Sequence, residues 1–518
     1  MPDRQMPKRT AIMLISLLFV VLYTVSIILL IFFKKSDSSY LSGDASKETS
    51  TSQVDTSSIP GLFFEQNSSN TPTESNSSDV ATENSDDSSS SEESDTGSSS
   101  NSNDTPQNNS NNNSSNTESS STPQKPVVST PKPSTPTVTP SKVDFSASIW
   151  ISVFDMESMG LKGMTKQEFQ TMIDEMFDNS VSLGIDTVFC QIRPYGDAFY
   201  SSNYFPYSKL LTGTGGVNPG YDPLKIMVSS AHKRKLEIHA WINPYRISAD
   251  STDLSKLADS NPAKIWLTDN NTANDRYVLS NGRGLYYNPA ILEVQKLIIN
   301  GVREICENYD VDGIHIDDYF YPDGVTDSFD SVEYTASGKI LSLADWRRAN
   351  VNALVAGMYS AVKSNGLTFG ISPAGNIDNN YKSLYADIKK WISTPGYTDY
   401  IIPQIYFGYN YPNSQFAYKN MLTDWMNLAR LSSVKMYIGL GNYKIDNPET
   451  AKNPSTNKLV TNYEWINETD VIARQTKDAY DKKADGVVLF SYGSVFGKSK
   501  NQIAQTNNFK EALTNIKD

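Results

Sequence analysis

The chain has 518 residues, of which 38% are hydrophobic and 20% are charged, and its formal net charge is −13. The chain is acidic and has no run of Lys and Arg interleaved with aromatic residues, so we exclude nucleic acid as a partner. The two cysteines, Cys190 and Cys306, both lie in apolar segments, where a free thiol packs as a small hydrophobic side chain. We therefore expect neither a disulfide bridge nor a reactive cysteine.

The N-terminal segment predicts a membrane anchor. Residues 11–33 form an uncharged run of 23 residues, and about 20 apolar residues span a bilayer. The alternative, a cleaved signal peptide, has an h-region of only about 7–15 residues and an Ala-x-Ala site, which is missing here. Positive charges flank the run on both sides, so the long downstream domain without a second span sets the orientation. We predict a single-pass cell-membrane protein with residues 1–10 in the cytoplasm and its catalytic domain outside.

A polar segment separates this anchor from the rest of the chain. Residues 34–143 are dominated by Ser, Asn and Thr, turn Pro-rich at their end, and carry most of the net negative charge. Such a composition cannot bury a core, so we predict a disordered linker. As a flexible coil of about 100 residues it would reach roughly 50–60 Å, which suits a domain that works in the cell wall while tethered to the membrane. A solvated stalk without further function is the alternative.

From residue 144 to 518, strand-like runs alternate with helical ones, which is typical of parallel α/β units. We expect strands at residues 147–154, 187–193, 237–243, 313–317, 368–372, 400–406, 436–440 and 486–491. We expect helices at residues 166–183, 223–235, 289–308, 343–365, 384–393, 416–430, 470–483 and 502–516. Eight such units predict a (β/α)8 TIM barrel, with long loops after its strands 2, 3, 4 and 7. The alternative is an open doubly wound sheet, which usually shows a Gly-rich turn after its first strand, where Asp155 to Ser158 stand here.

The fourth predicted strand is the centre of the predicted site, because it runs directly into two acids and an aromatic residue. A core strand gains nothing from such an ending, since a buried carboxylate without a partner is costly, so we place these residues at an open rim. Strand alternation divides the segment between two faces. One face carries His315, Asp317 and Tyr319, and the other carries Ile314, Ile316 and Asp318.

The residues that follow the other strands extend this site, because TIM barrels place their active sites at the carboxyl ends of the strands. These residues are mostly aromatic, amide or charged, a set that suits a polysaccharide: rings stack on sugars, and polar groups bond hydroxyls. The predicted substrate-binding residues are Arg193, Tyr195, Trp241, Asn243, Tyr245, Arg246, His315, Tyr319, Gln404, Tyr406 and Tyr492. We expect about half of the aromatic residues at the strand ends to be structural.

Two carboxyl groups are needed for ordinary glycoside hydrolysis. Asp317 is the first candidate, as nucleophile or base, and Asp318 could exchange roles with it or serve as a cap or ion-pair partner. For the second carboxyl, Asp155 and Asp197 rank together, ahead of Glu157. An Asp paired with a nearby Arg would stay ionised and act in binding, because a general acid needs a raised pKa.

Six motifs, in order and each at a strand end, carry a resemblance to a known family: WISVFDMESM, QIRPYGDAFYSS, HAWINPYRI, DGIHIDDYFYP, GISPAGN and IIPQIYFGY. They resemble the glycosyl-hydrolase-like family 10 domain. The resemblance implies a glycosidase-like (β/α)8 domain of the bacterial envelope that acts on peptidoglycan glycan strands. The fourth strand also resembles that of alpha-amylase-type barrels, in which the residue at the position of Asp317 is the nucleophile. It resembles chitinase-like barrels as well, but Tyr319 replaces their catalytic Glu.

We therefore predict a membrane-anchored, extracytoplasmic glycoside hydrolase for cell-wall glycan or a related polysaccharide. A non-catalytic polysaccharide-binding barrel is the alternative. A metal-dependent deacetylase is a third class, which the three histidines and the lack of His-x-x-His or paired-cysteine spacing disfavour. We expect no cofactor and no metal.

Overall fold

The computed structural model describes residues 144–322 and 324–518. The predicted cytoplasmic tail (residues 1–10), membrane anchor (11–33) and linker (34–143) lie outside these residues, so they stay predictions. Of the helices in the described part of the chain, none has both the length and the apolar character needed to cross a membrane.

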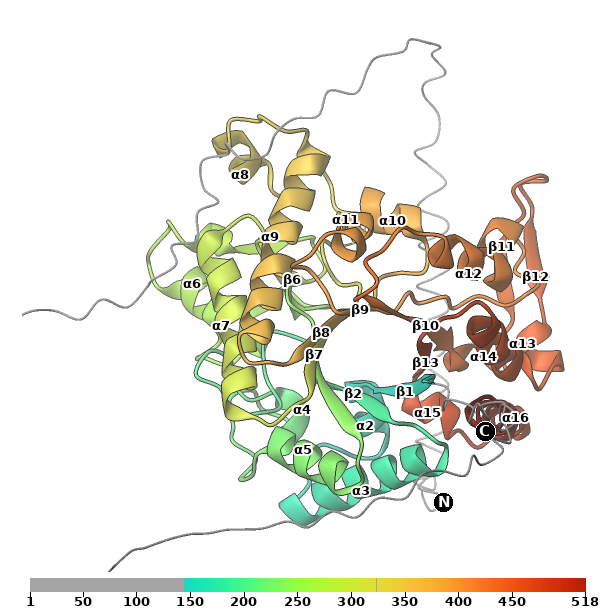
Figure 1. Cartoon of the computed structure of the whole chain (residues 1–518). Helices are drawn as coiled ribbons and strands as arrows, with labels where there is room; N and C mark the ends of the chain where they lie inside the picture. Colours follow the sequence, from blue (N-terminus) through green and yellow to red (C-terminus); the bar gives the residue numbers. More distant parts are fainter. Residues whose placement is uncertain (1–143, 323) are drawn as a thin grey trace, which may run out of the picture. The chain divides into compact units, whose positions relative to one another are not determined.

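Eight parallel strands form a closed barrel in the order β1-β13-β10-β9-β8-β7-β3-β2 (Figure 1). The strands are β1 (Ser146–Ile151), β2 (Thr187–Arg193), β3 (Glu237–Ile242), β7 (Gly313–Ile316), β8 (Thr368–Ile371), β9 (Tyr400–Ile401), β10 (Lys435–Gly441) and β13 (Gly486–Phe490). Each corresponds to one of the eight predicted strands. The barrel prediction is confirmed, and the open doubly wound sheet is excluded.

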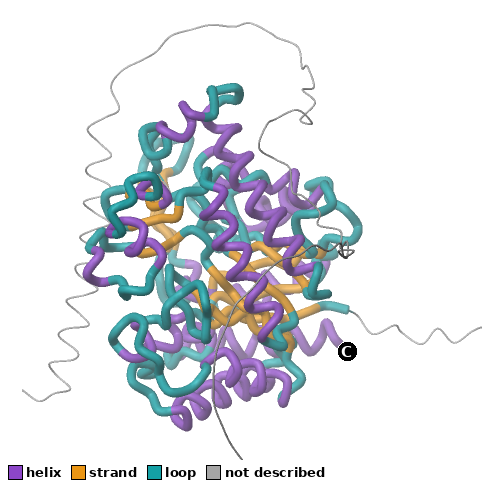
Figure 2. The backbone as a smooth tube through the Cα atoms, turned by 90° about the vertical axis from the view of Figure 1, so that its left-hand side faces the viewer, coloured by secondary structure: helices purple, strands orange, loops and turns teal. Residues whose placement is uncertain are grey.

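Helices surround the barrel on its outer side (Figures 1 and 2). The eight predicted helices are α3 (Lys166–Ser182), α5 (Pro223–Lys233), α7 (Leu292–Asn308), α9 (Leu343–Lys363), α11 (Ile388–Ser393), α12 (Tyr418–Met426), α14 (Val471–Asp481) and α16 (Lys500–Lys517). Local capping explains where several of them begin. Thr165 and Glu168 form a reciprocal capping box at the start of α3, and Ser499 and Gln502 do the same for α16.

The long loops carry small elements of their own. After β2 comes α4 (Lys209–Thr212). After β3 come β4 (Arg246–Ser248), η2 (Leu254–Lys256), α6 (Pro262–Thr268), η3 (Asp275–Tyr277), β5 (Val278–Ser280) and β6 (Leu285–Tyr287), with β4, β6 and β5 in one sheet. The remaining elements are α2 (Val153–Ser158), α8 (Ser331–Ala336), α10 (Ile377–Lys382), η4 (Ser414–Phe416), η5 (Asn442–Lys444), β11 (Glu449–Lys452), β12 (Leu459–Asn462), α13 (Glu464–Asn467) and α15 (Tyr492–Val495).

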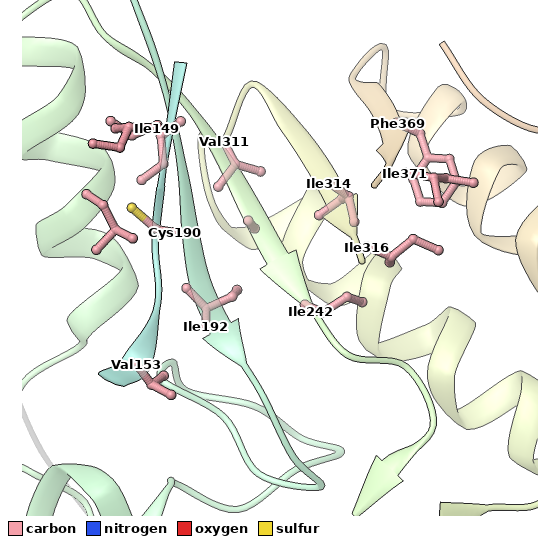
Figure 3. Packing of buried hydrophobic residues seen from close by; sticks show 14 of the residues in the cluster. Ile149, Val153, Cys190, Ile192, Ile242, Val311, Ile314, Ile316, Phe369 and Ile371 are labelled. Atoms are coloured by element: carbon pink, nitrogen blue, oxygen red, sulfur yellow. The ribbon is translucent and has the colours of Figure 1, made fainter. Parts of the chain in front are cut away.

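The barrel separates two apolar layers, as strand alternation requires. Outward-facing strand residues pack against the helices, and Figure 3 shows Ile314, Ile316 and Ile371 in this outer layer. The interior is filled by a separate cluster that consists of Trp150, Phe189, Trp241, Tyr400, Ile402 and Val488. A Cβ on Gly370 would overlap the Tyr400 ring at 1.8–2.3 Å, so a glycine is needed at this position.

Two predicted strands extend more than one residue beyond the observed ends, each for a local reason. The first strand ends at Ile151, because Ser152 and Asp155 form a capping box that starts α2. The sixth strand, β9, ends at Ile401. Beyond it Pro403 has no backbone N–H to donate to the ladder, and Gln404 makes only isolated bridges to Ala374 and Gly439.

Candidate active site

A cleft of about 220 Å³ opens at the carboxyl ends of the barrel strands. All eight strands, or the segments that follow them, contribute to its lining. The lining residues are Trp150, Ser152, Phe154, Gln191, Trp241, Arg246, Asp317, Asp318, Tyr319, Ser372, Gln404, Tyr406, Tyr443 and Phe490. Asp317 and Asp318 are the two carboxyl groups of this lining.

Asp317 lies at the floor of the cleft and is only 3% exposed. Its carboxylate accepts hydrogen bonds from Trp241 Nε1 at 3.0 Å, from Asn243 Nδ2 at 2.6 Å and from the Tyr319 backbone N–H at 3.3 Å. Burial, and to a smaller extent the neighbouring Asp318 carboxyl, raises the pKa of Asp317 to about 7. The side chain is therefore held in one orientation by three donors and titrates near neutral pH.

Asp318 reaches the same cleft, which corrects the expectation that alternation sends it to the opposite face. The strand ends at Ile316, so the two-residue period no longer applies two positions further along. Asp318 is half-buried and lines both the central cleft and an adjoining cavity of about 390 Å³. Burial raises its pKa too, whereas Gln404 and Arg246 act in the opposite direction. The two neighbouring acids form one electrostatic pair.

Arg246 and the rim aromatics form the wall beside this pair. The guanidinium of Arg246, at the start of β4, lies 3.9 Å from the centroid of the Tyr319 ring and 5.1 Å from that of Tyr195. Its Nε donates to the Pro194 carbonyl at 3.1 Å, which holds the side chain against the β2 loop. Of the predicted binding residues, Trp241, Arg246, Tyr319, Gln404 and Tyr406 line the cleft.

Three rings remain largely open to solvent at the cleft mouth. Phe154 is 66% exposed, Tyr319 47% and Tyr443 43%, and they come from the segments after β1, β7 and β10. Exposed rings around a cleft are surfaces on which sugar rings can stack. Phe154 and Phe490 are site residues that the sequence reasoning missed. Their position close to strand ends could have identified both residues. They were overlooked because they fall inside the predicted strands 147–154 and 486–491.

Six predicted binding residues do not line the cleft. Asn243 is buried, and it donates to Asp317 while its Oδ1 accepts from Gln191 Nε2 at 2.8 Å. His315 lies in the barrel interior, with Nδ1 3.2 Å from Tyr400 Oη. Burial holds the pKa of His315 well below its ordinary value, so the ring is neutral. Tyr245 packs in the outer core, and Tyr492 also packs there while its Oη accepts from Asn179 Nδ2 at 2.8 Å. The other two are Arg193, which is described next, and Tyr195, which lines a separate cavity.

Arg193 is turned away from the cleft by a backbone irregularity. The pairing of β2 with β3 shifts between Gln191 and Arg193, and such a bulge moves a side chain to the other face of a strand. The guanidinium lies buried over the Phe205 ring at 4.3 Å, beside Gly301 of α7. The prediction that Arg193 binds substrate is not supported by this position.

The candidates for a second carboxyl also lie outside the cleft lining. Asp155 accepts from Ser152 N and Oγ at 2.8 and 2.7 Å, and from Ser491 Oγ and Gly493 N at 2.8 Å each. These four donors occupy the carboxylate, so Asp155 ties the β1 segment to the β13 segment. Asp197 and the predicted binding residue Tyr195 line a different cavity, of about 210 Å³, where burial raises the pKa of Asp197 to about 6. Glu157 is exposed and lies near Lys209.

Within the described residues, no group of three or more His, Cys, Asp or Glu side chains is arranged to hold a metal ion. The two acids of the cleft lie beside Arg246 and are accompanied by neutral donors. The chemistry that this arrangement can perform is proton transfer by a carboxyl pair.

Replacing Asp317 by Asn should stabilise the fold at high pH. The folded pKa of about 7 exceeds the unfolded value of about 3.9, so the folded state binds more protons between these values and the unfolding free energy falls as pH rises through that window. Asn does not ionise, so at pH 8 the variant should be more stable by on the order of 2–4 kcal/mol, and the difference should vanish near pH 4. Urea unfolding of both proteins at the two pH values measures this.

Asp327→Asn is the matched control, because Asp327 is exposed in the same loop. The free energy of unfolding of Asp327→Asn should equal that of the parent at both pH values. Equal stability of the parent and Asp317→Asn at pH 8 would contradict the raised pKa.

A closed parallel barrel with a carboxyl pair in an aromatic cleft at its strand ends defines a glycosidase-like TIM barrel. The model of the Glycosyl hydrolase-like 10 family matches residues 147–456. The chain belongs to this family, which confirms the resemblance carried by the six motifs.

Two relatives are named as glycosyl hydrolases. YngK of Bacillus subtilis (strain 168) is 38% identical over 322 residues, which are 58% of this chain and 61% of YngK. DigH of Escherichia coli (strain K12) is 34% identical over 325 residues, which are 58% of this chain and 71% of DigH. The chain thus spans less than two thirds of YngK. The PgaB (BpsB) glycoside hydrolase domain of Bordetella bronchiseptica is 12% identical, with a TM-score of 0.43, over 72% of this chain and 99% of that domain.

Proposed function

We propose that this chain is a glycoside hydrolase that cleaves cell-wall glycan, namely peptidoglycan strands or a related polysaccharide. Residues 11–33 would anchor it in the cell membrane, with the N-terminus in the cytoplasm and the barrel outside. The observation that carries the proposal is the pair of Asp317 and Asp318 at the floor of an aromatic-lined cleft. Membership of the family and the names of YngK and DigH support the reaction class.

The electrostatics of the pair suit proton donation to a glycosidic oxygen. A general acid must hold its proton near the working pH, and an Asp exposed to water has lost its proton there. Burial raises the pKa values of both carboxyl groups here, and the charge of Asp318 raises that of Asp317 further. One proton shared by the pair at neutral pH is what an acid catalyst of glycoside hydrolysis needs.

The shape of the site suits a polymer. The central cleft continues into the adjoining cavity, and the two share Arg246, Asp318 and Tyr319. The adjoining cavity is lined by polar side chains that include Asn281, Arg283 and Asn379, which can bond sugar hydroxyls. Consecutive sugars could therefore occupy neighbouring positions on both sides of Asp318.

The test is to incubate the purified chain with peptidoglycan glycan strands, intact and freed of stem peptides, and to measure new reducing ends. We expect reducing ends to accumulate in proportion to the amount of protein. If the strands bind in a sedimentation assay without new reducing ends, the proposal of hydrolysis fails and the chain is a polysaccharide-binding barrel. If they neither bind nor are cleaved, the proposed substrate is wrong.

A further inference from the structure

A chain of hydrogen bonds connects Asp317 to the backbone that follows β1. The backbone N–H of Val153, at the start of α2, donates to Gln191 Oε1 at 3.1 Å, and Gln191 Nε2 donates to Asn243 Oδ1 at 2.8 Å. Asn243 Nδ2 in turn lies 2.6 Å from each carboxylate oxygen of Asp317. Gln191, Asn243 and Asp317 are each at most 3% exposed, so these bonds are shielded from water. The chain crosses four consecutive strands of the barrel, namely β1, β2, β3 and β7.

The first bond fixes the direction of the whole chain. A backbone N–H can only donate, and that of Val153 is the first N–H of α2, which has no acceptor within its own helix. Gln191 must therefore offer its carbonyl oxygen to Val153, which leaves its NH2 group to face Asn243. Asn243 must accept there with Oδ1, so its own NH2 group faces Asp317. Neither amide can turn by 180° without placing two oxygens or two donors against each other.

We propose that Gln191 is a positioning residue for the reaction: it fixes the direction of the Asn243 amide, which in turn sets the orientation and the charge of Asp317. The effect on catalysis rests on the proposed function, whereas the effect on Asp317 itself does not. Asn243, which was predicted to bind substrate, acts through Asp317 in this arrangement.

Opposing effects set the charge of Asp317. Burial raises its pKa to about 7, and the hydrogen bond from Asn243 acts against that rise. Together with Trp241 Nε1 and the Tyr319 N–H, the Asn243 amide fills the acceptor positions of the carboxylate. An Asn243 amide turned the other way would present Oδ1 to Asp317, and this contact favours the protonated carboxyl group. The direction of the chain therefore controls the proton that Asp317 shares with Asp318.

Gln191→Glu reverses the chain with a side chain of the same shape. Both oxygens of a carboxylate accept, so one keeps the bond from Val153, and the other requires Asn243 to donate to it. Asn243 Oδ1 then faces Asp317, and the pKa of Asp317 should rise by about one unit or more. The added charge also raises this pKa through space. Asn243→Leu separates the two effects, because it removes the amide and keeps a side chain of similar size.

Urea unfolding at a series of pH values measures the pKa of Asp317 without any assay of activity. The difference in unfolding free energy between a protein and its Asp317→Asn form changes with pH up to the folded pKa and is constant above it. The start of this plateau should move to higher pH in Gln191→Glu, and it should move clearly less when the same change is made in the Asn243→Leu protein. Equal shifts in the two backgrounds, or no shift in either, would overturn the inference. Asn243→Ala gives the same comparison should Asn243→Leu fail to fold.

The pH profile of kcat separates this inference from the proposed function. On peptidoglycan glycan strands, the alkaline limb of the profile should move to higher pH in Gln191→Glu together with the plateau, because the shared proton is then retained to higher pH. Unequal plateau shifts without any cleavage by the parent would support the inference and contradict the proposed function. Cleavage by the parent with equal plateau shifts would do the reverse, since a merely structural role of Gln191 leaves only the effect of the added charge.

Discussion

Asp318→Asn should lower kcat on glycan strands by about 10²–10⁴-fold, because it removes one of the two carboxyl groups that share the proton needed by the leaving oxygen. KM should change little, since Asn has the same shape and keeps polar contacts in the cleft. Initial rates of reducing-end formation measure both constants. The fold should be unaffected, because Asp318 is half-buried at the end of the strand and not part of the core.

Asp327→Asn is again the control, because it makes the same chemical change at an exposed position ten residues or fewer from the pair. It should retain the activity of the parent. If Asp318→Asn keeps more than a tenth of the parent rate while Asp327→Asn is fully active, Asp318 is not the acid. The proton would then come from Asp317.

Asp330→Asn should destabilise the fold by about 3–5 kcal/mol, because it leaves the charge of Arg347 buried without its partner. Both side chains of this pair are fully buried, and Arg347 Nε donates to both carboxylate oxygens of Asp330 at 3.0 Å. Arg347 also donates to Tyr385 Oη at 2.7 Å and to the Thr326 carbonyl at 2.9 Å. The network thus joins α9 to the loop that follows Asp317 and Asp318.

The midpoint of urea unfolding, with the slope of the transition, measures the loss. The exposed pair of Asp378 and Lys382 provides the matched control, and Asp378→Asn should leave the midpoint unchanged. The double variant Asp330→Asn, Arg347→Met should lose less free energy of unfolding than the two single variants lose together, because neither charge is then buried without its partner. Additive effects would show that the pair does not act as one unit.

The barrel could be predicted because its signals are local and repeated. The sequence predicts a strand at residues 187–193, and β2 has those bounds, since a mostly apolar segment rich in β-branched and aromatic residues fits a strand that is buried on both faces. Helix starts such as Thr165 with Glu168 are encoded within four residues. Two strands were predicted too long, because a competing local signal ends each of them. A capping box ends the first strand at Ile151, and a proline ends the sixth strand at Ile401.

The site could be predicted only in part, because alternation stops at the end of a strand. Trp241, Arg246 and Tyr406 were placed in the cleft by the rule that strand ends converge. Arg193 was misplaced because a bulge reversed its direction, and the sequence has no signal for that bulge. Asp318 was assigned to the wrong face because the chain leaves β7 two residues earlier.

The sequence by itself determined the family, the number of barrel strands and the segment that carries the two acids of the cleft. These follow from motifs and periodicities within short stretches, which depend on neighbouring residues only. The tertiary structure alone decided which carboxyl groups share the cleft, because that depends on contacts between strands far apart in the chain. In it, Asp155 joins the β1 segment to the β13 segment, and Asp197 lies in another cavity. Among the described residues that line the cleft, Asp317 and Asp318 are the only carboxyl groups.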